Sequence, residues 1–450
     1  MQLELHEIAD ICAGQLHGGT AVRVTSVHTD TRALAAGALF VALKGEQFDG
    51  HSYLAKAMAQ GAAAALVENV DNACSLPQIQ VQKTQLALGL LARAWLKRMP
   101  CKRIALTGSN GKTTVKNLTR TILSNVGQTC ATSGNFNNEI GLPLSALRVR
   151  DSDKFAVLEM GAGAPGDIEY LASIGLPQIA LVNNAAAAHL ERLISIEAVA
   201  HEKAAIYRAL PADGVAIIPF DDPQRALFIS SAKHVRQLTF GLSQEAQIRA
   251  EAIELAAHTN FKLTGPFGSA QITLPLLGPH NVRNALAAAA LSYAAGADLP
   301  AIISGLQSAQ AAAGRLQQVQ QVGGWFLIDD SYNANPGSVM AAIDTLRALH
   351  GKPVLVLGDM AELGENSAQL HAQVFDYAKQ QGLTTLFCWG VKTAAAVRTT
   401  GFGRAFDSLE LLIAALKTEI APEVQVLVKG SRSSKMERVV AAISSASSPC

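Results

Sequence analysis

A short glycine-rich segment offers the clearest chemistry in the sequence. Residues 107–114 read Thr-Gly-Ser-Asn-Gly-Lys-Thr-Thr and stand between an apolar run, which predicts a strand, and a helical pattern. Glycines let the backbone approach a ligand and turn successive N–H groups towards phosphate oxygens, and a helix N-terminus adds a favourable dipole. The segment therefore predicts an ATP site made by Thr107, Gly108, Ser109, Asn110, Gly111, Lys112, Thr113 and Thr114.

Two side chains of this segment have predicted roles of their own. The Lys112 ammonium is expected to reach the β- and γ-phosphates, and the Thr113 hydroxyl is expected to bind Mg²⁺. The strict phosphate-loop motif has glycine where this chain has Leu106. The shorter GxxGKTT pattern also arises by chance in glycine-rich turns, so the interpretation depends on its place between a strand and a helix.

Polar residues follow two later strands of the predicted sheet. Glu159 lies near the end of the apolar run 155–160, and His189 follows the run 179–182. A carboxylate at the C-terminal end of a parallel strand, beside a phosphate loop, is suited to bind Mg²⁺. The competing interpretations are an ordinary strand-end acid and a structural histidine.

Two further features do not predict a functional site from residue type alone. The stretch 161–166 matches GxGxxG, but no acid stands about 20 residues further on, so it predicts a turn rather than a dinucleotide site. Lys203 lies in a helical pattern, where a lysine is ordinarily a solvated side chain.

Three segments with different hydrophobic patterns must position these residues. Residues 1–82 hold short alternating runs and an alanine-rich helical stretch, which predict a small α/β unit. Strand, loop and helix patterns alternate over 83–312 and again over 313–450. We predict a three-domain α/β protein with a central P-loop-type, mostly parallel sheet and a C-terminal Rossmann-like doubly wound domain.

Composition disfavours several classes of protein. Apolar residues make up 49% of the chain and charged residues 16%, so large cores are possible and global disorder is not expected. A net charge of +1 gives no sign of a nucleic-acid partner. Neither a signal peptide nor a membrane-inserting stretch is predicted. Six scattered cysteines without a CxxC pair predict reduced thiols in a cytoplasmic protein.

Taken in order, the motifs resemble those of the Mur ligases over nearly the whole chain. They are TGSNGKTT, GNFNNEIGLP at 134–143, LEMGA, AAHLE, GPHNVRN at 278–284, Gly314-Arg315, DDSYNAN at 329–335, GDMAELG at 358–364 and KGSRS at 429–433. That family uses the shortened phosphate loop. DSYNANPGS and GDMAELG favour the branch that adds D-alanyl-D-alanine to a UDP-N-acetylmuramoyl-tripeptide. The lack of an Asp-Asn-Pro-Arg motif argues against the diaminopimelate-adding branch.

The resemblance implies a role for each domain. The N-terminal domain is expected to hold the UDP end of the acceptor through Ser26, Thr31, Arg32, Lys44, Asp49 and His51. The central domain is expected to bind ATP and two Mg²⁺, with Asn284 at the adenine and Asn137 and Asn138 at the acceptor. The C-terminal domain is expected to bring Arg315 to the phosphates and Asp330 to the ribose, and to complete the dipeptide pocket.

The resemblance also implies a catalytic set of Lys112, Lys203, His189 and Glu159. In the family the lysine at the position of Lys203 is typically carbamylated by CO₂, which makes it an anion able to bind Mg²⁺. The implied metal shell is Thr113, Glu159, His189 and the carbamate. The usual glycine-rich turn after AAHLE is replaced by Arg192-Leu-Ile194, which leaves the local loop geometry open.

The implied reaction is amide formation through an acyl phosphate, by a monomer with small-molecule substrates. Two alternatives stay open. A related amide ligase such as folylpolyglutamate synthetase lacks the N-terminal unit. A P-loop regulatory ATPase would have no use for GNFNNEIGLP or DSYNAN.

Overall fold

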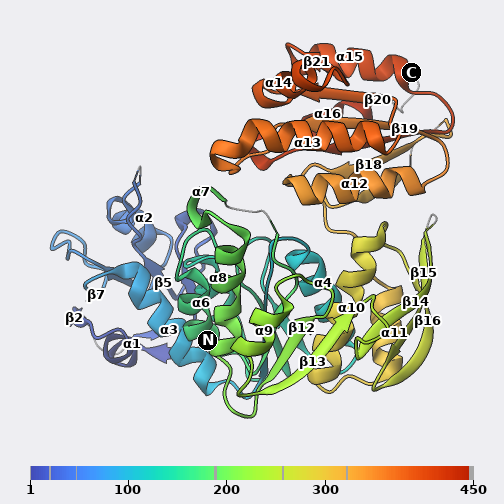
Figure 1. Cartoon of the computed structure of the whole chain (residues 1–450). Coiled ribbons are helices and arrows are strands. Elements are labelled where there is room, and N and C mark those ends of the chain that lie inside the picture. The colour runs from blue at the N-terminus through green and yellow to red at the C-terminus, as the bar shows by residue number, and fades with distance from the viewer. Residues whose placement is uncertain are drawn as a thin grey trace.

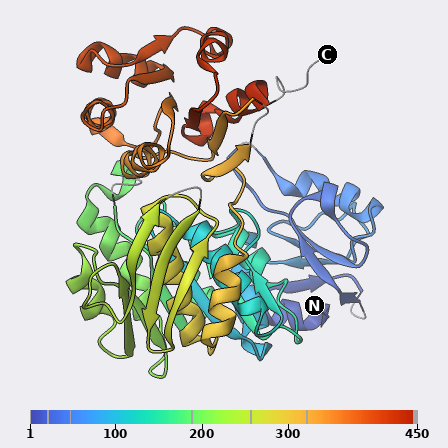
Figure 2. The same cartoon turned by 90° about the vertical axis from the view of Figure 1, so that its right-hand side faces the viewer.

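The computed structural model of the protein describes residues 2–19, 22–46, 48–186, 190–255, 258–320 and 323–444. Three bodies follow one another along the chain, each built around its own sheet (Figure 1). In Figure 2 the C-terminal body lies above the central one and the N-terminal body lies to its side. Within the described ranges, no helix has the length and apolar character needed to cross a membrane.

The N-terminal body contains a five-stranded sheet in the order β2-β7-β6-β5-β4. Its strands are β2 (Gln15–His17), β4 (Ser26–His28), β5 (Ala38–Val41), β6 (Ala64–Val67) and β7 (Gln78–Gln80), and only β2 runs antiparallel to its neighbour. The helices are α1 (Leu5–Ile11) and α2 (Leu54–Ala59), with the short turns η1 (Thr31–Ala33) and η2 (Gly50–Tyr53). A separate antiparallel pair joins β1 (Leu3–Glu4) to β3 (Arg23–Val24).

The central body contains nine strands in the order β16-β15-β14-β13-β12-β11-β8-β10-β9. They are β8 (Lys102–Thr107), β9 (Thr129–Ala131), β10 (Phe155–Glu159), β11 (Ile179–Val182), β12 (Val215–Pro219), β13 (Arg236–Gly241), β14 (Ile248–Leu255), β15 (Thr259–Gly265) and β16 (Gly268–Leu274). Strands β9 to β14 and β8 pair in parallel, and β14–β16 add an antiparallel edge. The sheet is therefore mostly parallel, as predicted.

Strand order explains where the central body can bind a ligand. The chain leaves β8, returns through β9 and β10 on one side of it, and then continues to β11 on the other side. The connections from these strands therefore diverge above β8, at the switch point where open α/β sheets bind ligands. The phosphate loop follows β8, Glu159 ends β10, and Asn183 follows β11.

Helices cover both faces of the central sheet. The cluster on one face includes α4 (Lys112–Ser124), α10 (Pro279–Ala294) and α11 (Leu299–Gln307). The other helices are α3 (Thr84–Arg98), α5 (Gly141–Ala146), α6 (Asp167–Gly175), α7 (Leu190–Leu193), α8 (Ile196–Arg208) and α9 (Arg225–Ser231). A second hydrophobic cluster contains side chains of α3, α6 and α8 together with strands of the N-terminal body, so the two bodies share one core.

The C-terminal body has the predicted doubly wound form. Its strands are β17 (Gln317–Gln320), β18 (Phe326–Asp330), β19 (Lys352–Gly358), β20 (Thr385–Trp389), β21 (Arg404–Phe406) and β22 (Val424–Lys429), in the order β17-β18-β22-β19-β20-β21. One hydrophobic cluster buries α12 (Pro336–Ala348), α13 (Ser367–Gln380) and α14 (Val391–Thr400), and another buries α15 (Leu409–Glu419) and α16 (Glu437–Ser444). The short turns are η3 (Gly364–Asn366) and η4 (Arg432–Ser434).

The three-domain α/β prediction is thereby confirmed. The junctions predicted after residues 82 and 312 fall in connections, since α3 begins at Thr84 and β17 begins at Gln317. The boundaries themselves stay predictions.

Candidate functional site

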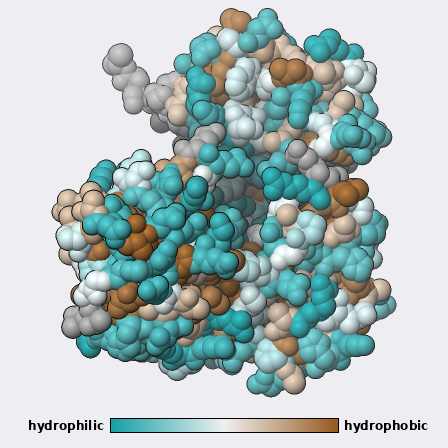
Figure 3. All heavy atoms as spheres, turned by 90° about the vertical axis from the view of Figure 1, so that its left-hand side faces the viewer, coloured by the Kyte–Doolittle hydropathy of each residue, from teal (hydrophilic) through white to brown (hydrophobic). Residues whose placement is uncertain are grey.

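A cavity of about 1540 Å³ lies between the central and C-terminal bodies. The space-filling view shows the molecule hollowed between its upper and lower parts, with mainly hydrophilic side chains around the hollow (Figure 3). The cavity brings together most of the predicted residues of these two bodies, namely Ser109, Asn110, Gly111, Lys112, Thr113, Thr114, Asn137, Asn138, Glu159, Asn284, Arg315 and Asp330.

The phosphate loop has the backbone that its glycines predict. Gly111 has a φ of +80° and caps α4, and an added Cβ there would meet the side chains of Asn183 and Asn284. Lys112 begins α4, and its ammonium donates to the carbonyl oxygens of Gly108 (2.6 Å) and Ser109 (3.3 Å). Burial lowers the pKa of Lys112, with Glu159 opposing that effect and Arg315 adding to it.

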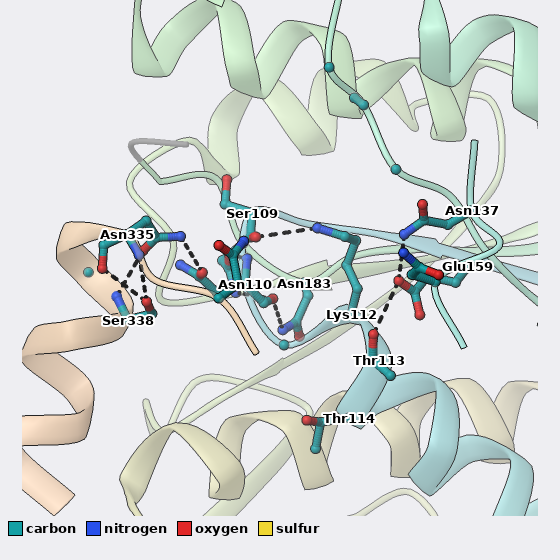
Figure 4. Close-up of a pocket in the computed structure, with 18 of the residues that line it drawn as sticks. Ser109, Asn110, Lys112, Thr113, Thr114, Asn137, Glu159, Asn183, Asn335 and Ser338 are labelled. Atoms are coloured by element: carbon teal, nitrogen blue, oxygen red, sulfur yellow. Dashed lines mark hydrogen bonds between the residues drawn. The ribbon is translucent and has the colours of Figure 1, made fainter. Parts of the chain in front are cut away.

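Glu159 contacts this loop through Thr113, and two hydrogen bonds hold its side chain (Figure 4). Its Oε1 accepts from the Thr113 hydroxyl (3.2 Å) and from Asn137 Nδ2 (2.8 Å). Its Oε2 is buried without a hydrogen-bond donor among the described residues, and the residue is 1% exposed. A buried carboxylate oxygen beside a threonine hydroxyl suits a hard cation such as Mg²⁺, which keeps several waters and needs few protein ligands.

The two other predicted metal ligands are His189 and Lys203. His189 lies outside the described residues, and within the described ranges no cluster of three or more His, Cys, Asp or Glu side chains has metal-binding geometry. Lys203 lies on α8, is only 1% exposed, and is absent from the cavity lining. Burial lowers the pKa of Lys203 to about 7, with the Lys112 charge acting in the same direction. It is therefore not the solvated lysine that its residue type suggests.

Several backbone donors of the glycine-rich stretch 161–166 are already occupied. Asp167 Oδ2 accepts from the N–H groups of Gly163 (2.8 Å) and Ala164 (2.7 Å). Glu202, the neighbour of Lys203 on α8, accepts from Gly166 N (2.8 Å) and Ile168 N (2.7 Å). Because two carboxylates already use these donors, the stretch is the turn that was predicted and not an anion-binding loop.

A chain of carboxamides crosses the cavity between the two bodies. Asn284 Nδ2 donates to Asn281 Oδ1, and Asn183 Nδ2 donates to Asn284 Oδ1, each at 2.9 Å. Asn183 also donates to the backbone oxygen of Asn110 (2.9 Å), and Asn335 Nδ2 donates to Asn110 Oδ1 (2.7 Å). The last bond joins Asn335, the N-cap residue of α12, directly to the phosphate loop (Figure 4).

Asn335 gives a test of this contact. Its Oδ1 caps α12 by accepting from Ser338 N, so serine at this position keeps a cap but is too short to reach Asn110. We expect Asn335→Ser to weaken the association between the C-terminal and central bodies by about 1 kcal/mol, the typical net contribution of one hydrogen bond. Small-angle scattering should show a larger radius of gyration with an unchanged melting temperature. An unchanged radius, or a lowered melting temperature alone, would count against the contact as a latch.

The C-terminal residues at the cavity are themselves paired. The Arg315 guanidinium lies over the Tyr332 ring, 4.2 Å from its centroid. Asp330 Oδ2 lies 2.5 Å from Lys429 Nζ, and Asp330 Oδ1 accepts from Leu316 N (3.2 Å). Both oxygens of the predicted ribose ligand thus have protein partners, and Lys429 is a cavity residue to which the sequence assigned no role.

The predicted UDP-site residues belong to the N-terminal body and do not line this cavity. Arg32 forms an exposed ion pair with Asp30 (2.6 Å), and Lys44 forms a backbone bridge with Asp49. Asp49 Oδ1 contacts His51 Nδ1 (2.6 Å), whose Nε2 accepts from Glu68 N, so this pair also has a structural use. Ser26 Oγ is buried without a partner among the described residues, and Thr31 is buried.

The sequence prediction did not include Asn183 and Lys429, which line the cavity, or Lys116, which lies beside Glu159. Asn183 had a recognisable signal, because a polar residue directly after a buried parallel strand lies at the ligand edge. Lys116 had a weaker signal, its spacing of one helical turn from Lys112 on α4.

The chain is similar in sequence to proteins of known function. The chain matches three family models: the Mur ligase family, catalytic domain (residues 23–96), the Mur ligase middle domain (106–292) and the Mur ligase, glutamate ligase domain (314–432). It is 43% identical over 98% of both chains to the UDP-N-acetylmuramoyl-tripeptide--D-alanyl-D-alanine ligase of Escherichia coli K12.

Solved structures agree over nearly the whole chain. A crystal structure of MurF from Acinetobacter baumannii superposes with a TM-score of 0.94 at 35% identity, covering 99% of both chains. The MurF ligase of Thermotoga maritima in complex with ADP has a TM-score of 0.85 at 27% identity, covering 94% of this chain and 97% of that one.

Proposed function

The chain belongs to the Mur ligase family, and from this premise we propose that it joins D-alanyl-D-alanine to UDP-N-acetylmuramoyl-tripeptide, coupled to conversion of ATP to ADP and phosphate, in peptidoglycan precursor synthesis. The match to the Escherichia coli ligase extends through the N-terminal body, which the folylpolyglutamate alternative lacks. One observation carries the proposal. The phosphate loop, Glu159, the loop bearing Asn137 and Asn138, and Arg315 of the C-terminal body all line one cavity.

The proposed chemistry has two steps. The tripeptide's terminal carboxylate oxygen attacks the γ-phosphorus of ATP, forming an acyl phosphate as the bond to ADP breaks. The neutral amine of the dipeptide then attacks the acyl carbon, and phosphate leaves as the amide forms and the amine proton is lost. Activation is required because a free carboxylate has no usable leaving group.

The chain's own residues position the reactants and offset charge. Lys112 and Arg315 neutralise the negative charge that accumulates when a carboxylate approaches a phosphate. Asn137 and Asn138 hold the acceptor at the mouth of the phosphate loop, and Asn284 and Asp330 take the adenine and ribose. The N-terminal residues Ser26, Thr31, Arg32, Lys44, Asp49 and His51 hold the UDP end.

Thr113, Glu159, His189 and Lys203 as its carbamate are proposed to hold two Mg²⁺ ions. Bound there, the ions supply further positive charge to the phosphates. The oxygen donors of Thr113 and Glu159 fit this role, because Glu159 Oε2 is buried and has no hydrogen-bond donor among the described residues. We further propose a cytoplasmic monomer with domain boundaries at 82/83 and 312/313.

A substrate panel tests the proposed function. We expect phosphate release from ATP only when UDP-N-acetylmuramoyl-tripeptide and D-alanyl-D-alanine are both present, in a one-to-one ratio with amide formed. D-Glutamate or diaminopimelate with the shorter acceptors serve as alternative pairs. Phosphate release without an acceptor would instead favour a regulatory ATPase, and turnover with an alternative pair would assign a different step of the pathway.

A further inference from the structure

Lys116 is a buried lysine that the proposed chemistry does not use. It lies on α4 one turn after Lys112, and only 2% of its surface is exposed. Lysine is almost never this buried unless its charge is paired, because desolvating an ammonium is costly. The partners of Lys116 therefore indicate what it does.

Its ammonium reaches two separate parts of the site. Nζ donates to the backbone oxygen of Gly134 (3.0 Å) and lies 3.6 Å from Glu159 Oε2. The first partner begins the loop that carries Asn137 and Asn138 into the cavity, and the second is the proposed metal-binding carboxylate. At 3.6 Å the contact with Glu159 is an ion pair without a hydrogen bond, which leaves Oε2 free for another ligand.

The loop is anchored at two points that both lead back to Glu159. Near the start of the loop, the carbonyl oxygen of Gly134 accepts a hydrogen bond from Lys116, and Gly134 itself has a φ of +51°. Further along, Asn137 donates to Glu159 Oε1 and accepts from Gly161 N (2.8 Å). A displacement of Lys116 therefore disturbs the position of the acceptor loop and the charge at the carboxylate together.

We propose that Lys116 is a positioning residue that fixes the acceptor loop through Gly134 and limits cation affinity at Glu159 through its charge. The inference rests on the proposed function, because it assigns the loop to the acceptor and the carboxylate to a divalent cation. The two parts of the proposal predict opposite changes in binding affinity when Lys116 is replaced. Losing the hydrogen bond weakens acceptor binding, whereas losing the positive charge strengthens cation binding at Glu159.

Two substitutions separate these effects. Lys116→Met keeps the length of the side chain but removes both donor and charge, whereas Lys116→Gln keeps an N–H donor without charge. Arg120→Met is the matched control, since Arg120 is an exposed cation one turn further along α4. Mn²⁺ titrated by electron paramagnetic resonance in the presence of ADP reports cation binding independently of turnover, and KM values report the acceptor.

We expect both Lys116 variants to bind Mn²⁺ at least about threefold more tightly than wild type, because a like charge has been removed. The KM for the acceptor should rise about tenfold in Lys116→Met and less in Lys116→Gln, with the KM for ATP little changed. Arg120→Met should match wild type in both measurements.

Weaker Mn²⁺ binding in both variants, or an acceptor KM unchanged in Lys116→Met, would overturn the proposal. If Lys116→Met fails to fold, the Mn²⁺ affinity of Lys116→Gln decides the result. Failure of the proposed function is distinguishable, since wild-type enzyme would then not turn over the acceptor at all.

Discussion

Lys112→Met should lower the rate of phosphate release at least about a thousandfold, because one cation held against the transferring phosphate contributes several kcal/mol to its transition state. Methionine matches the length of lysine and cannot place a charge there. The ammonium of Lys112 is held 2.6 Å from the carbonyl of Gly108, so its position is set by the loop backbone itself.

The measurement is acceptor-dependent phosphate release under saturating ATP, with ATP affinity determined separately by displacement of a fluorescent nucleotide. Lys97→Met, at an exposed lysine near the end of α3, is the control for loss of one positive charge. Turnover of Lys112→Met within about tenfold of wild type would remove the loop lysine from the chemistry, whatever the change in affinity.

Local sequence was enough to predict the centre of the site. The strand, glycine loop and helix around Lys112 are consecutive, so their geometry follows from residue type and order. Glu159 was predictable for a related reason, because the C-terminal ends of parallel strands meet at one edge of a sheet. Lys112 and Glu159 line the same cavity, and their roles stay predictions.

Contacts between distant segments could not be predicted in this way. The bond from Asn335 to Asn110 joins residues 225 positions apart, and the Lys429–Asp330 pair joins residues 99 apart. Each depends on how the C-terminal body docks or on which strands become neighbours, and no residue type encodes that by itself. The burial of Lys203 is of the same kind, because it depends on the elements that pack over α8.

Substitution of the buried Lys203 is the second change from which we expect a large loss of activity. Lys203→Ala should be almost inactive, and short carboxylates such as formate or acetate should partly restore turnover. Carbamylation requires a neutral amine, whose nitrogen forms a bond to the carbon of CO₂ while one C–O π bond breaks and a proton leaves. The carbamate carries a negative charge in place of a positive one, which allows it to bind Mg²⁺ as the unmodified lysine cannot.

The pKa of Lys203 makes this reaction possible near neutral pH. Burial lowers that pKa to about 7, so the amine is mostly protonated at pH 6 and mostly neutral at pH 8. An ordinary lysine, with a pKa near 10.4, would have almost no neutral amine at either pH. The rate at which CO₂-depleted enzyme regains activity on adding bicarbonate should therefore rise as the pH increases through 7. Carbamylation would also replace one of two neighbouring positive charges with a negative one, because the Lys112 charge is one of the causes that lower the pKa of Lys203.

Rescue separates this role from a structural one. A small carboxylate can enter the space left by Lys203→Ala and supply the missing negative oxygen, whereas Lys203→Arg fills that space with a permanent cation and should not respond. We expect about 0.1 M acetate to raise the activity of Lys203→Ala at least tenfold, the scale of restoring one charged ligand near the phosphates. A ¹³C nuclear magnetic resonance signal from enzyme equilibrated with ¹³C-bicarbonate should be present in wild type and absent from Lys203→Ala. Full activity of Lys203→Ala without added carboxylate would contradict the proposal. It would show that turnover requires neither a carbamate nor an ammonium at this position.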